Sequence, residues 1–140
     1  MTKKILIIDD EPDIRDYLMA VLEDHGYITH SVDEKESILE AVTTLRPDLI
    51  FLDIMMPERS GLSLYRELRT TPETANIPIA LLTGVTSDTA YLRTAISKFL
   101  EEESISSTSR FIDKPIDIPE LLSSIESLLH EGRDPSDVAT

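Results

Sequence analysis

The 140-residue sequence has no cysteine, which excludes disulfide bonds, thiolate zinc sites and thiol nucleophiles. It also lacks any apolar run near the ~20 residues that a membrane span needs. The few apolar residues between Lys4 and Asp9 are too short a run for a signal peptide. We therefore expect a cytoplasmic protein with no membrane partner, stabilised by the packing of its core.

Basic residues are scarce: 13 Lys and Arg stand against 27 Asp and Glu, for a formal net charge of -14. This charge repels the phosphate backbone that supplies most non-specific nucleic-acid affinity, so we expect no direct binding to nucleic acid. The length and the 41% hydrophobic content suit one globular domain. We expect this domain to span residues 1–131, and the polar residues 132–140 to form a tail or the start of a linker.

Short apolar runs alternate with helical apolar patterns along the chain. The runs predict strands over residues 4–8, 28–32, 48–52, 77–82 and 110–112. Helices are predicted to follow each strand; the second and the last carry acidic capping pairs, Asp33 with Glu36 and Asp117 with Glu120, and the fourth covers about 88–100. The alternation predicts an α/β fold of (βα)5 type, a doubly wound five-stranded parallel sheet with helices on both faces.

Polar side chains follow four of the predicted strands: Asp9 and Asp10, Asp53, Thr83, and Lys114. Doubly wound sheets bind ligands beyond the carboxyl ends of their strands, so these groups are expected to share one crevice. Clustered carboxylates repel one another unless a hard divalent cation is present, and oxygen ligands with room for water favour Mg²⁺ over zinc. We predict a magnesium site beside a phosphoryl site, with Thr83 and Lys114 on the phosphoryl oxygens and Asp53 as the nucleophile.

Four motifs occur in order: Ile7 to Pro12 (IIDDEP), Pro47 to Pro57 (PDLIFLDIMMP) with Gly61, Leu82-Thr83-Gly84, and Lys114-Pro115. Together they resemble the receiver domain of two-component response regulators, the CheY-like superfamily. The resemblance runs from about residue 3 to residue 130. It implies a flavodoxin-like sheet with strand order 2-1-3-4-5.

The resemblance also implies a role for each matching residue. Asp53 would accept a phosphoryl group from a sensor histidine kinase or a histidine phosphotransfer protein. Asp10 and Asp53 would ligate Mg²⁺ through their side chains, Asp9 mainly through water, and Met55 through its backbone carbonyl. Thr83 and Lys114 would hold the phosphoryl oxygens.

Phe111 stands at the position of the family's switch aromatic. When Thr83 moves toward the phosphoryl group, this ring would enter the vacated space and alter the face formed by helix four, strand five and helix five. The output would be a change in protein binding, with a homodimer through that face as one form. The protein would then be a phosphoacceptor switch and not an independent enzyme.

Two features depart from the family pattern. The connection before strand five is long because of residues 101–109 (EEESISSTS), which suggests an unusual partner or altered dimerisation. Met55 and Val85, which flank the acceptor, are apolar and would restrict the attacking water. We therefore expect a long-lived phosphoaspartate.

Two other functions compete with this interpretation. A Mg²⁺-dependent phosphohydrolase with an aspartyl-phosphate intermediate needs a general acid shortly after the nucleophile, and Asp53-Ile54-Met55 has none. A phosphorylation-independent scaffold need not retain all the site residues together. His25, His30 and His130 show no ligand spacing and are expected at the surface, not in a phosphorelay.

Overall fold

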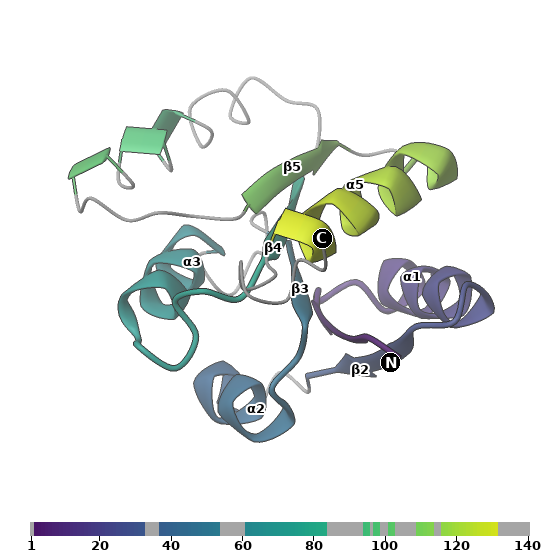
Figure 1. Cartoon of the computed structure of the whole chain (residues 1–140), viewed down its shortest axis with the longest axis horizontal. Coiled ribbons are helices and arrows are strands. Elements are labelled where there is room, and N and C mark those ends of the chain that lie inside the picture. The colour runs from purple at the N-terminus through teal and green to yellow at the C-terminus, as the bar shows by residue number, and fades with distance from the viewer. Residues whose placement is uncertain are drawn as a thin grey trace, which may run out of the picture.

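The computed structural model describes residues 2–32, 37–53, 61–83, 94–95, 97–98, 101–102, 109–113 and 116–131. Its strands are β1 (Lys4–Ile8), β2 (Ile28–Ser31), β3 (Leu49–Asp53), β4 (Ile79–Thr83) and β5 (Ser109–Asp113), shown in Figure 1. Its helices are α1 (Pro12–Asp24), α2 (Ile38–Leu45), α3 (Gly61–Thr70) and α5 (Ile118–Glu131). None of these helices is long and apolar enough to cross a membrane.

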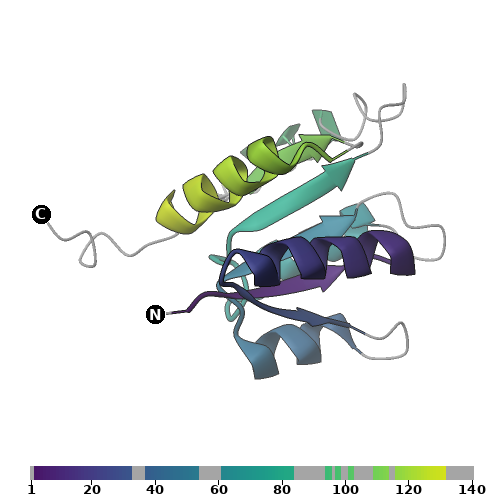
Figure 2. The same ribbon diagram turned by 90° about the vertical axis from the view of Figure 1, so that its right-hand side faces the viewer.

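The five strands form one parallel sheet in the order β2-β1-β3-β4-β5, which confirms the predicted fold class. All strand arrows point toward one end of the molecule in Figure 2. The chain runs from β1 outward to β2 and then crosses back to β3 on the other side of β1. The strand order therefore reverses between β1 and β3, the place where doubly wound sheets bind ligands.

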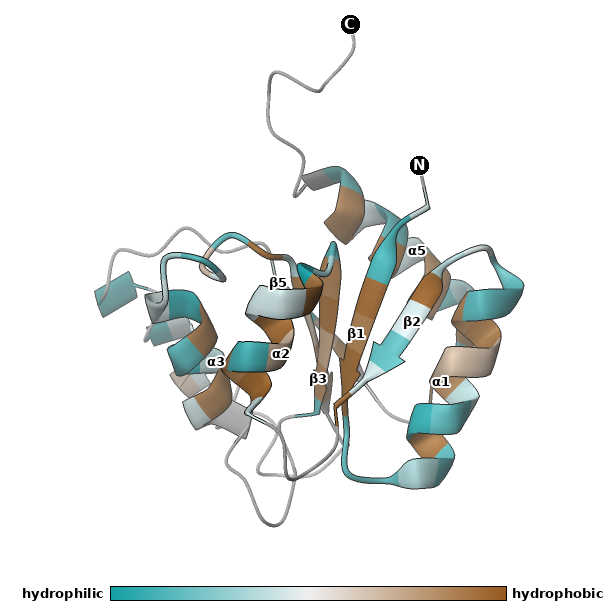
Figure 3. Ribbon diagram, turned by 90° about the horizontal axis from the view of Figure 1, so that it is seen from below, coloured by the Kyte–Doolittle hydropathy of each residue, from teal (hydrophilic) through white to brown (hydrophobic). Residues whose placement is uncertain are grey.

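The core lies in two layers, one on each face of the sheet. One layer joins alternate strand residues to α2 and α3, and the other joins the remaining strand residues to α1 and α5. In Figure 3 the strands lie between the two helix pairs, and β1 and β3 are largely hydrophobic. Because β1, β3 and β4 are covered on both faces, their sequences are nearly continuous apolar runs.

Helix α2 begins later than its predicted cap. The N-cap is Ser37, whose hydroxyl accepts a hydrogen bond from the Glu40 backbone N–H at 3.4 Å, and not Asp33, which lies outside the described residues. Ser37 and Glu40 have the same spacing as the predicted pair. Ser37, however, directly precedes Ile38, the first apolar residue of the helix, and Glu40 lies in its first turn. The prediction of Asp33 as the cap was therefore wrong.

The strand boundaries differ from the prediction by one or two residues. Strand β4 begins at Ile79 instead of residue 77, because Pro78 has no N–H to donate and the Ile77 carbonyl accepts a hydrogen bond from Arg69. Strand β2 ends at Ser31, and β5 gains a residue at each end.

Two predicted segments fall wholly or mostly outside the described residues. Of the helix predicted over 88–100, the described residues 94–95 and 97–98 are helical, as are 101–102 after it. The tail at 132–140 is not described.

Candidate functional site

Three carboxylates meet at the carboxyl ends of β1 and β3. Asp9 and Asp10 directly follow β1, and Asp53 is the last residue of β3. The two strands are neighbours in register, with Ile8 paired to Leu52, so the next residue of each strand lies at the same level. The parallel register therefore brings together acids that are more than 40 positions apart in the sequence.

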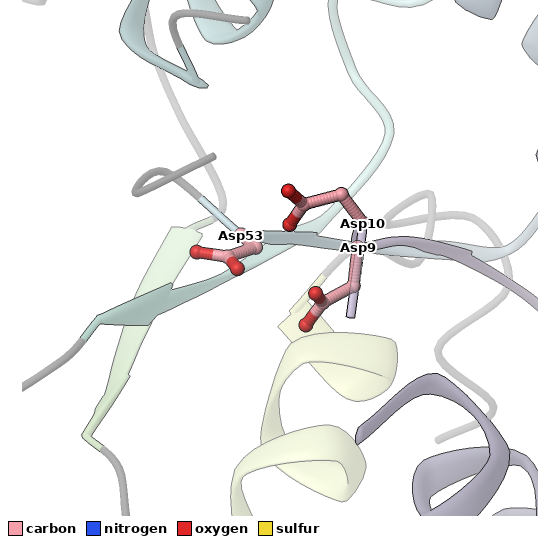
Figure 4. Close-up of side chains that lie close together, drawn as sticks. All are labelled: Asp9, Asp10 and Asp53. Carbon is pink, nitrogen blue, oxygen red and sulfur yellow. The ribbon is translucent and has the colours of Figure 1, made fainter. Parts of the chain in front are cut away.

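These acids are close enough to share an ion. One carboxylate oxygen from each of Asp9, Asp10 and Asp53 lies within 4.8 Å of the others. Figure 4 shows the side chains gathering where the two strands end. Asp53 is 1% exposed and Asp9 5% exposed, whereas Asp10 is half-buried. Their mutual repulsion is therefore weakly screened by water, and a cation placed between them would offset it.

The donor set fits a hard divalent cation. All three donors are carboxylate oxygens. Among the described residues, Asp9, Asp10 and Asp53 form the cluster of potential metal ligands that lie close enough together to hold an ion. Oxygen-only ligation is typical of Mg²⁺ and Ca²⁺ and differs from the nitrogen and sulfur ligands usual for zinc. The half-exposed Asp10 leaves the cluster open to water on one side.

The backbone of Glu11 orients one of the three acids. Its N–H donates to Oδ1 of Asp9 at 2.9 Å, an Asx turn that leads into Pro12 at the start of α1. The sequence predicts the carboxylates but not this contact, which the structure adds. The contact could have been predicted, because an Asp side chain before a helix commonly accepts a hydrogen bond from the backbone N–H two residues later.

The remaining predicted site residues are described only in part. Thr83 is the last residue of β4, one position beyond the Leu82 that pairs with Asp53, so its backbone lies at the same edge of the sheet. The side chain of Thr83 and all of Met55, Val85 and Lys114 lie outside the described residues. The structure thus assembles the three acids and places the Thr83 backbone beside them.

Phe111, the predicted switch aromatic, lies in the middle of β5. It pairs with Leu81 of β4, is half-buried and packs against the core layer on the α2 and α3 face. The three histidines do not belong to the acidic cluster. His25 and His130 are exposed, and His30 is half-buried on edge strand β2.

Comparison with known proteins agrees with this architecture. The model of the response regulator receiver domain family matches residues 5–126. The chain is 31% identical over 134 residues to the "DNA-binding response regulator MtrA" of Mycolicibacterium smegmatis, covering 96% of this chain and 54% of that protein. It is 35% identical over 127 residues to the "DNA-binding dual master transcriptional regulator RpaA" of a Synechocystis strain, covering 90% of this chain and 48% of that protein. The chain therefore spans about half the length of these relatives.

Solved structures give the same result. The signal receiver domain of a signal transduction histidine kinase from Syntrophus aciditrophicus superposes with a TM-score of 0.77 at 30% identity, over 99% of this chain and 98% of that one. The chemotaxis protein CheY4 of Vibrio cholerae gives a TM-score of 0.72 at 25% identity, over 91% of this chain and 99% of that one. With the sheet order, the acidic cluster and the family match in agreement, this chain belongs to the response regulator receiver domain family.

Proposed function

We propose that this receiver domain is a phosphorylation switch in which Asp53 accepts a phosphoryl group from a histidine in a Mg²⁺-dependent reaction. The observation that carries the proposal is the convergence of Asp9, Asp10 and Asp53 at the strand-order reversal. This arrangement supplies a cation site and a nucleophile at the place where the fold binds ligands. A scaffold that worked without phosphorylation would have no use for such a cluster.

The cation would be held by side-chain oxygens of Asp10 and Asp53, by Asp9 mainly through water, and by the backbone carbonyl of Met55. When bound, Mg²⁺ neutralises the clustered carboxylates and polarises the phosphoryl group for attack. Asp53 is almost completely buried at the end of a central strand, which limits the motion of its backbone and would help to position the nucleophile.

The transfer itself uses one oxygen of Asp53. That oxygen forms a bond to phosphorus while the P–N bond of the donor phosphohistidine breaks, and the imidazole nitrogen leaves with the bonding electron pair. Thr83 and Lys114 would bind the oxygens of the transferred group. The apolar Met55 and Val85 would limit the access of water, which supports a long lifetime for the phosphoaspartate.

The partners follow from this chemistry. A sensor histidine kinase or histidine phosphotransfer protein would supply the phosphoryl group in the cytoplasm. The face around Phe111, altered by phosphorylation at Asp53, would bind a downstream protein or a second copy of the chain. The two relatives named as DNA-binding are about twice as long as this chain, and the net charge of -14 supports an indirect route to DNA for this domain. The domain would have no independent substrate.

Intact mass measurement tests the proposal directly. The purified chain is incubated with Mg²⁺ and acetyl phosphate, beside a metal-free sample and the Asp53→Asn variant. Asp24→Asn, an exposed acid on α1, is the matched control. We expect one phosphoryl adduct on the wild type and on Asp24→Asn, and none on Asp53→Asn or without metal. An adduct on Asp53→Asn, or no adduct on a folded wild type, would refute the proposal.

A further inference from the structure

A second polar cluster lies at the start of β5, away from the carboxylates. Its members are Tyr65 and Arg69 of α3 and Ser109, the first residue of β5. The Tyr65 hydroxyl and the Ser109 hydroxyl are 2.9 Å apart, and Nη2 of Arg69 donates to the same Ser109 oxygen at 2.9 Å. The Ser109 hydroxyl is thus held by two side chains that are 40 and 44 positions away in the sequence.

Arg69 is the centre of this cluster. It is 2% exposed, and its Nη1 donates to the carbonyl oxygens of Ala75 at 2.9 Å and of Ile77 at 2.7 Å. Its guanidinium also lies 5.3 Å from the centre of the Tyr65 ring. One side chain therefore joins three segments: helix α3, the residues before β4, and the first residue of β5.

Strand β5 has few other features that fix its position. Among the described strands it lies at the edge of the sheet and pairs with β4, and it follows the long connection after Thr83. Its two apolar residues are adjacent, so Phe111 faces the α2 and α3 layer while Ile112 faces the α1 and α5 layer. A slip of one residue would carry Phe111 to the other face and bring Arg110 or Asp113 to a position that faces the core. Within the strand, only Phe111 and Ile112 specify the register through apolar burial.

Ser109 removes the ambiguity. It precedes Phe111 by two positions, so the two side chains lie on the same face of the strand. Ser109 pairs with Ile79 and Phe111 with Leu81, and a slip would carry the hydroxyl of Ser109 away from both of its partners on α3. Buried polar groups that must find one partner are a known means of specifying register.

We propose that the cluster of Tyr65, Arg69 and Ser109 is a positioning network that fixes the start and register of β5 and thereby holds Phe111 in its place for switching. The switching role of Phe111 rests on the proposed function. The resting position of the ring does not. The network leaves the carboxyl end of β5, where phosphorylation would act, free of these contacts, so that any rearrangement starts from one defined strand position.

Fluorine NMR of protein labelled with 4-fluorophenylalanine tests this proposal. The chain has only three phenylalanines, so a Phe111→Leu variant assigns the relevant signal. The test variant is Ser109→Ala, which removes the hydroxyl, and the comparison variant is Ser109→Thr, which keeps it. Ser31→Ala, an exposed serine on the other edge strand β2, is the matched control. Phosphoryl uptake from acetyl phosphate is followed by mass in the same samples.

We expect Ser109→Ala to shift or split the resting Phe111 signal and to lose most of its phosphorylation-dependent change, while phosphoryl uptake at Asp53 stays close to that of the wild type. Ser109→Thr and Ser31→Ala should behave as the wild type does. Tyr65→Phe removes one hydroxyl without opening the core, and it replaces Ser109→Ala if that variant fails to fold.

A Phe111 signal that matches the wild type in both states overturns the proposal, even if the variant is less stable. A Phe111 signal in Ser109→Thr that matches the Ser109→Ala signal also overturns it, because the effect would then not depend on the hydroxyl. If the wild type takes up no phosphoryl group, the proposed function fails, and the resting Phe111 signal still decides whether the network positions the ring.

Discussion

The two ends of the sheet use buried polar groups in opposite ways. At the carboxyl end, Asp9, Asp10 and Asp53 bring charges of one sign within 4.8 Å of one another. At the amino end, the donors of Arg69 meet carbonyl and hydroxyl acceptors. Like charges cost folding free energy until a cation binds, whereas matched donors and acceptors stabilise the fold without a ligand. The carboxylates at one end could hold an ion, whereas the matched groups at the other end join neighbouring segments.

Lys4 and Asp48 give a second example of matching at the amino end. The Lys4 backbone N–H donates to a carboxylate oxygen of Asp48 at 2.8 Å, and the Asp48 N–H donates to the Lys4 carbonyl at 2.7 Å. The Lys4 ammonium donates to the Leu45 carbonyl at the end of α2, also at 2.8 Å. A cation at a helix C-terminus interacts favourably with the helix dipole, so this contact stabilises the start of β1.

The largest expected effect on stability comes from removing Arg69, the buried cation at the amino end. Arg69→Met would remove the donor to the Ala75 and Ile77 carbonyls and one of the two partners of the Ser109 hydroxyl, and we expect the free energy of unfolding to fall by about 3 to 5 kcal/mol. Urea unfolding measures this loss. Arg66→Met on the exposed side of the same helix is the control, with an expected loss below about 0.5 kcal/mol. Equal losses in the two variants would mean that the buried contacts contribute no net stability.

Removing one charge at the carboxyl end should have the opposite sign. In metal-free buffer we expect Asp53→Asn to raise the free energy of unfolding by about 1 to 2 kcal/mol, because it relieves repulsion among three weakly screened carboxylates. The wild type should gain stability on addition of Mg²⁺, and the variant should gain much less. Asp24→Asn serves as the exposed control in the same urea titrations. A lower stability of metal-free Asp53→Asn would contradict the view that this end is strained by its charges.

A smaller effect is expected at the amino end at high pH, where ionised Tyr27 would place a negative charge near Glu126. Burial raises the pKa of Tyr27 above its ordinary value of 10.0, and the nearby Glu126 carboxylate raises it further. The neutral phenol is therefore favoured in the folded protein. Its contribution to stability is present below pH 10.0 and is lost as the pH rises through the raised pKa.

Alkaline unfolding curves of wild type and Tyr27→Phe measure this contribution. We expect the wild type to lose stability more steeply than the variant above that pH, and parallel curves would contradict the expected shift. Glu126→Gln should lower the pKa of Tyr27 only part of the way, because burial is the larger cause.

The carboxylate end was accessible to sequence analysis because its signals are local. A buried apolar run followed by an acid marks both Asp9 and Asp53, and the alternation of strands and helices predicts that parallel strands deliver such residues to one edge. Once the order β2-β1-β3-β4-β5 was expected, the proximity of these acids followed from topology alone.

The amino end was not accessible in this way. The helical pattern places Arg69 one turn after Tyr65, closer to the apolar stripe than Arg66, but it does not predict full burial of a charged side chain. That burial depends on acceptors supplied by other segments. The sequence places Ser109 in the long connection, whereas in the structure it is the first residue of β5. The cap of α2 was misplaced for a related reason: two similar capping pairs precede that helix, and tertiary packing of Ile38 selects the later one.

The core layer on the α1 and α5 face has a consequence for how the chain is made. It joins Ile5 of the first strand to Leu128 of the last helix, and β5 pairs with β4 only after the connection between them has been closed. Contacts so distant in sequence form slowly, since the entropy of a large loop must be lost before they gain any energy. During synthesis the face of β1 that packs against α5 therefore lacks this helix until nearly the whole domain has emerged. Ile5 and Ile7, which belong to this layer, would be natural targets for chaperones in that interval.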